Sequence, residues 1–516
     1  MKAQDAVPAN PFASAREQFD RIVRDLESET TFAMTHGDLE EHLRTEGFEL
    51  LRRLFQGHLD ARRPGEVAET VVGADGAART HRREGERQLM TIFGEVTVRR
   101  MRYGGRGIDS VIPLDAALNL PVEQHSHGVR RRVALEATRG SFDDAVDAVR
   151  TTTAATVGKR QAEALTAAAA VDFDAFYTAP RADESAATGS LLVISTDGKG
   201  VVMRPEALRP ATRKAARTRR HKLKHRLSKG EKRDAKRMAM VAAVYTIAPF
   251  VRRPSDIVHA LAGTEPGPAR PRPEHKRVWA SLAKSAEEVI VEAFDEAERR
   301  DPHHTRRWVA LVDGNKHQIR IMRREAAARG IALTIILDII HVTEYLWKAA
   351  HVFFAEGDRA AEDWVTERLR IILHGRPGAM AGGMRRSATR RALDPGDRAP
   401  VDDCADYLVD YKDLMHYDAY LADGLPIATG VIEGACRHLV NDRMDITGAR
   451  WGLDGAEAVL RLRALKSSGD LDAYWSFHLG REYERNHKSR FRGGVIPAVL
   501  HFPTPRSSSD RAQKAA

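Results

Sequence analysis

The length of 516 residues predicts about three or four domains. The hydrophobic fraction of 42% is enough for each to have a conventional core. No stretch reaches the roughly 18 uninterrupted apolar residues of a membrane span, and residues 1–13 lack the segments of a secretion signal, so we expect a cytoplasmic protein with no membrane partner. The two cysteines lack the spacing of a disulfide framework or a zinc site, whereas the net charge of +10 favours a polyanionic partner such as nucleic acid.

The first two regions differ in periodicity. In residues 1–65, apolar residues from Leu39 to Leu59 recur at near-helical spacing, which predicts a helix pair suited to oligomerisation or to holding DNA ends. In residues 66–125, apolar and polar residues alternate from 87 to 103, which predicts a β-hairpin that turns at Gly94-Glu95.

Residues 126–180 predict three short helices, the second capped by Ser141 with Asp144 three residues later. Short helices with small residues at their junctions fit a helix-turn-helix, whose last helix enters the major groove. The side chains expected to contact phosphates and bases are Thr153, Thr156, Lys159, Arg160 and Gln161. The alternative is a helical bundle that touches no DNA, because helix-turn-helix patterns are weakly specific in one sequence.

The excess positive charge is concentrated in residues 211–238, which contain thirteen Lys or Arg against one Glu and one Asp. Such a density favours a polyanion, because each neutralised phosphate releases condensed counterions. The predicted DNA contacts in this segment are Arg217, Arg219, Arg220, Lys222 and Lys224. A solvated loop without a specific partner is the alternative.

Residues 190–349 and 427–466 are predicted to form an α/β catalytic core. The expected strands are residues 191–195, a hairpin partner at 201–204, and residues 238–247, 308–312 and 331–337, with helices at 278–299 and 316–329. This βββαβαβ order followed by a late helix is ribonuclease-H-like. Residues 350–426 then form an all-helical insertion, broken by a basic, glycine-rich loop at 374–391, and residues 467–516 a C-terminal helix and a disordered tail. The expected fold is multidomain α+β, with helical and helix-turn-helix regions before the core.

Two of these strands are followed by Asp-Gly, at Asp197 and Asp313, and Glu433 lies in the late helix. Carboxylates from three distant segments can seat two divalent ions about 3.5–4 Å apart, as two-metal phosphoryl transfer requires, and hard cations such as Mg²⁺ prefer oxygen ligands. Each residue also has a structural interpretation. The aspartates could begin turns, and Glu433 could cap its helix near Thr429 or pair with Arg437, which could in turn orient a metal ligand.

Four segments resemble the DDE-type transposases of bacterial insertion sequences, closest to the ISKra-type family and more distantly to mutator-like transposases. They are STDGKG (195–200), LVDGNKHQ (311–318), LDIIHVTEYLWKAA (337–350) and GVIEGACRHLVNDRMDITGARW (430–451), and the likeness covers most of the chain from about residue 38 to 451. The resemblance implies a catalytic triad of Asp197, Asp313 and Glu433 with two Mg²⁺ ions, for which Mn²⁺ can substitute. It also implies terminal inverted repeats and target DNA as partners, a homo-oligomer that holds two DNA ends, and association with the bacterial nucleoid when bound to DNA.

Several assignments stay open at this point. Asp338 also ends an apolar strand, and Asp338-Ile339-Ile340-His341 is similar to a motif of related transposases. Asp338 is therefore the alternative to Asp313 as the second carboxylate, and His341 is an auxiliary residue. The structural alternative is that Asp338 caps a helix and His341 packs against the protein. Arg450 and Trp451 could grip or stack on a flipped base, or Trp451 could pack in the core. A non-catalytic DNA-binding or domesticated descendant is the competing function, and a resolvase or repair nuclease on the same fold is a third.

Overall fold

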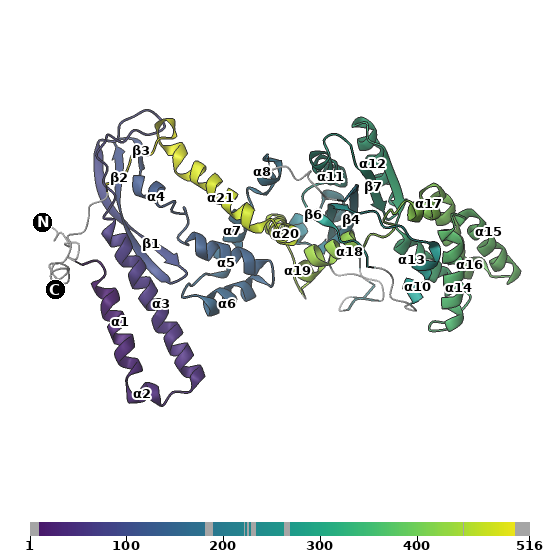
Figure 1. The fold of residues 1–516 in the computed structure, drawn as a ribbon, viewed down its shortest axis with the longest axis horizontal. Coiled ribbons are helices and arrows are strands. Elements are labelled where there is room, and N and C mark those ends of the chain that lie inside the picture. The colour runs from purple at the N-terminus through teal and green to yellow at the C-terminus, as the bar shows by residue number, and fades with distance from the viewer. Residues whose placement is uncertain are drawn as a thin grey trace. The chain divides into compact units, whose positions relative to one another are not determined.

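The computed structural model describes residues 10–180, 189–220, 222–223, 226–228, 234–262, 269–446 and 448–500. The chain divides into two compact units, which Figure 1 shows as ribbons: an amino-terminal unit, Met1–Thr178 with Asp472–Ala516, and a central unit, Ala179–Leu471. In the described part of the chain no helix is both long and apolar enough to span a bilayer. The architecture is multidomain α+β, and each unit has its own sheet.

The amino-terminal unit begins with three helices, α1 (Ala13–Leu26), α2 (Glu29–Phe32) and α3 (His36–Ala61). The helical interpretation of this region is therefore confirmed. The amide of Gln18 on α1 donates to Glu46 on α3 at 2.7 Å and is buried, which fixes the two helices against each other. Leu43, Leu51 and Leu54 of the predicted apolar pattern remain exposed.

A three-stranded antiparallel sheet follows, formed by β1 (His81–Thr91), β2 (Gly94–Gly105) and β3 (Ile108–Val111). The hairpin is confirmed, but its predicted turn at Gly94-Glu95 is wrong. Thr91 pairs with Gly94 and Met90 with Glu95, so the turn is at Ile92-Phe93. Gly94 has φ of +113°, a left-handed conformation that glycine adopts without a steric penalty, and this lets β2 begin directly after the turn.

In its described residues, this unit has six further α-helices, three of which, α5, α6 and α7, share a small core. They are α4 (Pro113–Ala117), α5 (His127–Ala137), α6 (Phe142–Thr152), α7 (Lys159–Ala169), α8 (Phe173–Thr178) and the carboxyl-terminal α21 (Leu471–Asn486). The three helices predicted for 126–168 are α5, α6 and α7, and Ser141 with Asp144 forms the predicted capping box. Val133, Val149 and Leu165 bring these helices together. Beyond α21, Phe491 and Val499 pack near Val67, and the predicted tail from residue 503 lies outside the described residues.

The central unit is built on a mixed five-stranded sheet in the order β6-β5-β4-β7-β8. β5 is antiparallel to both β4 and β6, whereas β4, β7 and β8 are parallel. The strands are β4 (Leu191–Val202), β5 (Lys236–Ile247), β6 (Glu274–Ser281), β7 (Arg307–Val312) and β8 (Leu333–Leu337).

Two predictions for this sheet were wrong, one of a strand and one of a helix. Residues 201–204 do not form a separate hairpin partner, because β4 continues through Asp197 to Val202 and pairs along its whole length with β5. The helix predicted from residue 278 begins only at Ala286, because Val278, Trp279 and Ala280 are buried in β6. Residues 274–281 form the strand β6 because they pair with β5. The sequence did not indicate this strand, because it directly follows a proline-rich stretch.

Helices pack against and around this sheet. They are α9 (Pro210–Thr218), α10 (Pro254–Ala262), α11 (Ala286–Arg300), α12 (Lys316–Ala328), α13 (Ile339–Ala350), α18 (Gly430–Ala435), the π-helix η3 (Cys436–Asn441), α19 (Asp442–Met444) and α20 (Leu453–Ser468). α11 contacts β4 and β5, α20 contacts β6, and α18 with η3 reaches β4 and β5. The late helical segment expected to carry Glu433 is thus present.

The predicted helical insertion is also present, in the same compact unit as the sheet. Its helices are α14 (Arg359–Leu373), α15 (Pro377–Arg390), α16 (Pro395–Asp410) and α17 (Tyr417–Ala422). The loop predicted at 374–391 was wrong, because most of it is α15. Met380, Met384 and Ala388 recur at helical spacing and are buried, and this packing outweighs the low helix propensity of the glycines.

Candidate functional site

Three aspartates lie level with one another on neighbouring parallel strands, Asp197 within β4 and Asp313 and Asp338 directly after β7 and β8. Ser195 pairs with Leu311 and Val312 with Leu337, so Asp197, Asp313 and Asp338 follow in register on or just beyond β4, β7 and β8. The Asp338 amide donates to the carbonyl of Val312 at 2.8 Å, which extends this register beyond the last strand pair. Because neighbouring strands are about 4.8 Å apart, Asp313 has Asp197 on one side and Asp338 on the other. We call these three residues, together with Glu433, the carboxylate row.

Glu433 enters the row on a segment that crosses the strand ends. Ile339 donates its amide to the carbonyl of Ile427, and Thr429 contacts Asp338, which places the start of the segment beside β8. Cys436, three residues after Glu433, donates its thiol to Asp197 Oδ2 at 3.2 Å on β4. The segment therefore runs from the outer strand to the central strand, and Glu433 lies between those two contacts.

Asp338, His341 and Glu433 form the tightest potential ligand group. Each offers one ligand atom, and these atoms lie within 4.8 Å of one another. Neither Asp197 nor Asp313 joins a group of three at that spacing in the part of the chain that the structure describes. The sequence interpretation gave Asp338 and His341 an auxiliary or alternative role, and the structure places them closest to Glu433.

Asp338 is both a ligand candidate and a helix cap. Its side chain is fully buried, and Oδ1 accepts the amide of Ile340 at 3.0 Å as the N-cap of α13, which is the structural alternative considered for this residue. Thr429 contributes its amide at 3.3 Å and a short hydrogen bond from its hydroxyl. His341 is half-buried, with Nε2 4.0 Å from Asp338 and Nδ1 3.5 Å from Glu344.

The electrostatics of this group favour an added cation. Burial raises the pKa of Asp338, and the hydrogen bonds from Thr429 and Ile340 offset this only in part. Partial burial of the Glu433 carboxyl and the nearby charge of Asp338 raise the pKa of Glu433, against the opposing effect of His341. A divalent cation between the two carboxylates would reverse this balance, because it favours their ionised forms.

Asp313 and Asp197 are held in different ways. Asp313 accepts the amide of Asn315 at 2.8 Å in a turn, so its turn-forming role is present, and Gly314 follows with φ of +98°. Two tyrosines of the insertion fix this turn: Tyr407 donates its hydroxyl to the Asp313 carbonyl at 3.0 Å, and Tyr411 donates to the Gly314 carbonyl. Asp197 begins no turn, because it pairs with Val241 within β4.

Arg437 does not pair with Glu433, although the spacing of four residues suggested this. Its guanidinium is 76% exposed and lies 3.9 Å from Asp442. The π-helix that begins at Cys436 changes the phase of the segment, so the i,i+4 rule of an α-helix does not apply here. Glu433 instead accepts from the Thr429 hydroxyl at 3.5 Å.

Three of the predicted DNA contacts lie in the first turn of α7, and Thr153 and Thr156 precede this helix. Thr156, Lys159, Arg160 and Gln161 are exposed, whereas Thr153 is buried. Lys159 forms a surface ion pair with Asp143 at 2.6 Å, and the Gln161 side chain accepts the Gly158 amide at 2.9 Å.

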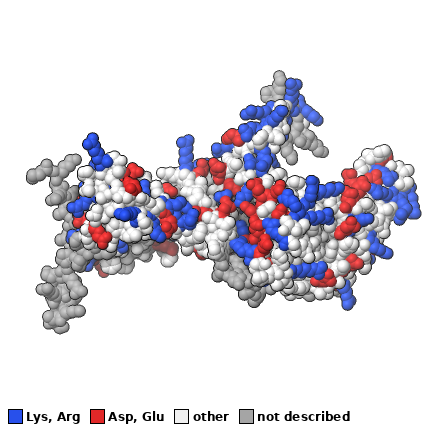
Figure 2. All heavy atoms as spheres, turned by 90° about the horizontal axis from the view of Figure 1, so that it is seen from above, with Lys and Arg blue, Asp and Glu red and all other residues white. Residues whose placement is uncertain are grey.

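The basic segment is exposed where it is described. α9 has no buried residue, and Arg217, Arg219, Arg220 and Lys222 are exposed; Lys224 lies outside the described residues. Figure 2 shows that Lys and Arg on the visible face lie in several groups and are not spread evenly. This surface can approach a polyanion without rearrangement of a core.

Trp451 packs in the core, the alternative to base stacking. It is buried, its indole donates to the Met444 carbonyl at 3.1 Å, and Arg443 lies 4.7 Å from its ring. The stacking role proposed for its ring does not agree with this burial. Arg450 remains exposed, 3.4 Å from Asp234.

Thr429, Cys436 and Tyr407 were not predicted as site residues. Cys436 gives no local signal, because a π-helix begins at this residue and its hydrogen bond to Asp197 spans 239 residues. Tyr407 gives no local signal, because it reaches Asp313 across 94 residues. Comparison of this chain with protein-family models and with curated proteins finds no match.

Proposed function

We propose that the protein is a DDE transposase of a bacterial insertion sequence, which binds terminal inverted repeats and catalyses Mg²⁺-dependent cleavage and transfer of DNA strands. The observation that carries the proposal is the register of Asp197, Asp313 and Asp338 at the strand ends, crossed by the segment that bears Glu433. Three antiparallel strands followed by two parallel ones, in the order β6-β5-β4-β7-β8, support a ribonuclease-H-like core.

The donor set fits hard divalent cations. Asp197, Asp313 and Glu433 would supply carboxylate oxygens, which Mg²⁺ and Mn²⁺ prefer, and none of these residues has a Lys or Arg ion-pair partner in the described parts of the chain. Two such ions would activate water or a 3′-hydroxyl and stabilise the departing oxygen. The protein's own part is to hold the oxygens in place: Cys436 orients Asp197, and Tyr407 and Tyr411 fix the turn at Asp313.

The roles of Asp338 and His341 follow from their positions. Asp338 is fully buried and hydrogen-bonded by Thr429 and Ile340, which suits a residue that positions the crossing segment. Asp313 is less buried and lies beside Asp197, which suits a metal ligand. We therefore assign the second carboxylate to Asp313, with Asp338 as the alternative.

The partners follow from the charge distribution. Double-stranded DNA would meet Lys159, Arg160 and Gln161 of α7, Thr156 just before it, and the basic residues around α9. Arg450 is exposed near the α9 segment. A transposase holds two DNA ends, so we propose a dimer or a larger homo-oligomer, located in the cytoplasm and on the nucleoid when bound to DNA.

The test is cleavage of a labelled inverted-repeat duplex, taken from the flanks of the gene, with Mg²⁺ or Mn²⁺. Wild type should nick the duplex, and Asp197→Asn should bind it equally well without nicking. Binding by wild type without metal-dependent nicking would contradict the proposal and support the competing function, a non-catalytic DNA-binding or domesticated protein. Nicking that follows DNA shape and not the terminal sequence would support a resolvase or repair nuclease.

Cysteine variants distinguish Asp313 from Asp338. A thiolate binds the softer Mn²⁺ better than Mg²⁺, so replacing a metal-binding carboxylate by cysteine should abolish nicking with Mg²⁺ and leave a measurable rate with Mn²⁺. We expect this metal dependence for Asp313→Cys, and loss with both metals for Asp338→Cys. The reverse pattern would assign the second carboxylate to Asp338.

A further inference from the structure

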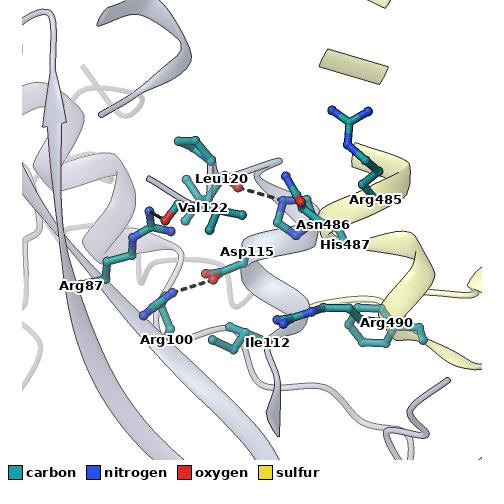
Figure 3. A pocket seen from close by; sticks show the side chains of 12 residues that line it. Arg87, Arg100, Ile112, Asp115, Leu120, Val122, Arg485, Asn486, His487 and Arg490 are labelled. Carbon is teal, nitrogen blue, oxygen red and sulfur yellow. Dashed lines mark hydrogen bonds and ion pairs between the residues drawn. The ribbon is translucent and has the colours of Figure 1, made fainter. Parts of the chain in front are cut away.

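A cavity of about 440 Å³ lies within the amino-terminal unit, and no residue of the carboxylate row lines it (Figure 3). Its walls come from β1, β2, the stretch 112–122 that includes α4, and the end of α21 with the residues after it. Four arginines line it against a single carboxylate: Arg87, Arg100, Arg485, Arg490 and Asp115.

Two of these charges are compensated inside the protein. Arg100 and Asp115 form an ion pair at 2.6 Å, with side chains 8% and 14% exposed. Arg485 makes two hydrogen bonds to Asp172, at 2.6 and 2.9 Å, and in Figure 3 it points away from the centre of the cavity. These pairs leave the charges of Arg87 and Arg490.

Arg87 and Arg490 have no carboxylate within ion-pair distance in the described residues. Arg87 donates to the carbonyls of Val122, at 2.9 Å, and Glu123, which hold its guanidinium without neutralising it. Burial and the neighbouring Arg100 lower the pKa of Arg87, the former more strongly, although the charge of Asp115 opposes them. In Figure 3, Arg490 extends toward Asp115 from the opposite wall. Two arginines without an ion-pair partner around one hollow repel each other unless an anion lies between them.

His487 adds a polar group of defined tautomer. Its Nε2 lies 2.8 Å from the Leu120 carbonyl, which can only accept, so Nε2 carries the hydrogen. Burial lowers the pKa of His487, and the hydrogen bond to the Leu120 carbonyl is the main effect that opposes this shift. With Nε2 protonated, Nδ1 of the neutral ring is a hydrogen-bond acceptor. A protonated oxyanion could donate to this nitrogen.

We propose that this cavity is a binding site for a phosphate group, held by the guanidinium groups of Arg87 and Arg490. Guanidinium forks match phosphate oxygens with paired hydrogen bonds, and groups that approach from opposite walls suit a tetrahedral anion with oxygens in several directions. The phosphate can be a free ion, the terminal monoester of a DNA end or a backbone diester. The site lies outside the carboxylate row and needs no divalent metal.

The test uses the full chain with EDTA at constant ionic strength and follows the ³¹P line width of inorganic phosphate. Wild type should broaden the resonance saturably, and Arg87→Gln and Arg490→Gln should each weaken binding by about tenfold or more, because each removes a charge-assisted pair of hydrogen bonds. Arg492→Gln is the matched control: Arg492 is an exposed neighbour outside the cavity wall and should bind as wild type does. Equal loss in all three variants, or no saturable broadening by wild type, would overturn the proposal.

Competition identifies the source of the phosphate. A short oligonucleotide with a 5′-phosphate that displaces inorganic phosphate, while its unphosphorylated twin does not, would identify the terminal monoester. Displacement by both would identify the backbone diester, and displacement by neither the free ion. Displacement by either oligonucleotide supports the site if Arg490→Gln abolishes it, and displacement by neither supports a site for the free ion if Arg490→Gln weakens the binding of inorganic phosphate. Displacement that persists in Arg490→Gln would place the oligonucleotide elsewhere and contradict the site.

Discussion

Two groups of acids in this molecule are held in opposite ways: one is buried in the amino-terminal unit, and the other joins the buried Asp338 to the exposed Glu433 in the central unit. In the amino-terminal unit, Arg130 binds Glu482 through two hydrogen bonds at 2.7 and 2.5 Å, and Asp172 binds His478 at 2.7 Å and Arg485 at 2.6 Å. We call these five residues the ion cluster. In the central unit, Asp338 and Glu433 receive a hydroxyl, backbone amides and a half-buried histidine.

The pKa values reflect this difference. Burial would raise the pKa of both Asp172 and Glu482, but the hydrogen bonds and charges of Arg485, His478 and Arg130 outweigh it, and both values lie below the usual range. The pKa values of Asp338 and Glu433 lie above it. The acids of the ion cluster are paired with arginine or histidine, whereas Asp338 and Glu433 have no Lys or Arg ion-pair partner in the described residues, which suits Glu433 to an external cation.

The largest expected effect is the loss of stability when an ion pair of the ion cluster is removed. Arg130→Met leaves Glu482 buried without an arginine partner, with only His478 and His127 nearby at 3.6 and 3.9 Å, which should cost about 3–5 kcal/mol of stability. Hydrogen exchange of the α5 and α21 amides measures this loss in the amino-terminal unit. Arg131→Met is the control, because Arg131 pairs with Asp472 at the exposed surface and should cost about 0–1 kcal/mol. Similar costs for both variants would break the comparison.

The second effect concerns the carboxylate row. Mg²⁺ or Mn²⁺ should stabilise the central unit by about 2.7 kcal/mol at a hundred times its dissociation constant, if it binds only the folded state. Glu433→Gln should remove most of this stabilisation, as measured by hydrogen exchange of α13. Glu367→Gln, a change at an exposed glutamate of α14, should retain it. A metal response unchanged in Glu433→Gln would contradict a site at the row.

The sequence predicted most of the elements around these sites because their signals are local. The Ser141 capping box and the apolar strand before Asp313 each lie within a few residues. β6 and α15 were missed because distant packing decides them: β6 exists through pairing with β5, and α15 through buried methionines among glycines.

The candidate site was predictable in its residue types but not in its grouping. Asp197, Asp313 and Glu433 stood out as acids after strands and in the late helix, and the register of β4, β7 and β8 places the two aspartates level. That Glu433 lies nearest Asp338 and His341 depends on the contact between Thr429 and Asp338, across 91 residues. No local pattern carries this information.

The third effect is pH dependence in the ion cluster. Acids with lowered pKa values contribute stability that is present above their unfolded pKa values, about 4, and is lost as the pH falls through the lowered folded values. Hydrogen-exchange protection of α5 and α21, corrected for the intrinsic exchange rate, should therefore fall below about pH 4. The loss should be smaller in Glu482→Gln, which cannot titrate at this position. Equal pH dependence in wild type and this variant would show that Glu482 does not contribute to it.

The smallest effect concerns the neutral donor at Asp197. Burial raises the pKa of Cys436, with the charge of Asp197 adding to it, so the thiol stays protonated and donates to Asp197. Cys436→Ser keeps a hydrogen-bond donor and should change stability by less than about 1 kcal/mol. Cys436→Ala removes the donor and should cost about 1 kcal/mol without metal. With saturating Mg²⁺ the cost of Cys436→Ala should be smaller, because the cation then compensates the charge of Asp197. Cys404→Ser is the control, because Cys404 is buried in α16 and its substitution should respond equally with and without metal. A metal-independent cost for Cys436→Ala would reduce this thiol to a packing group and leave the Gly198 amide, 2.6 Å from Asp197 Oδ1, as the neutral donor to Asp197.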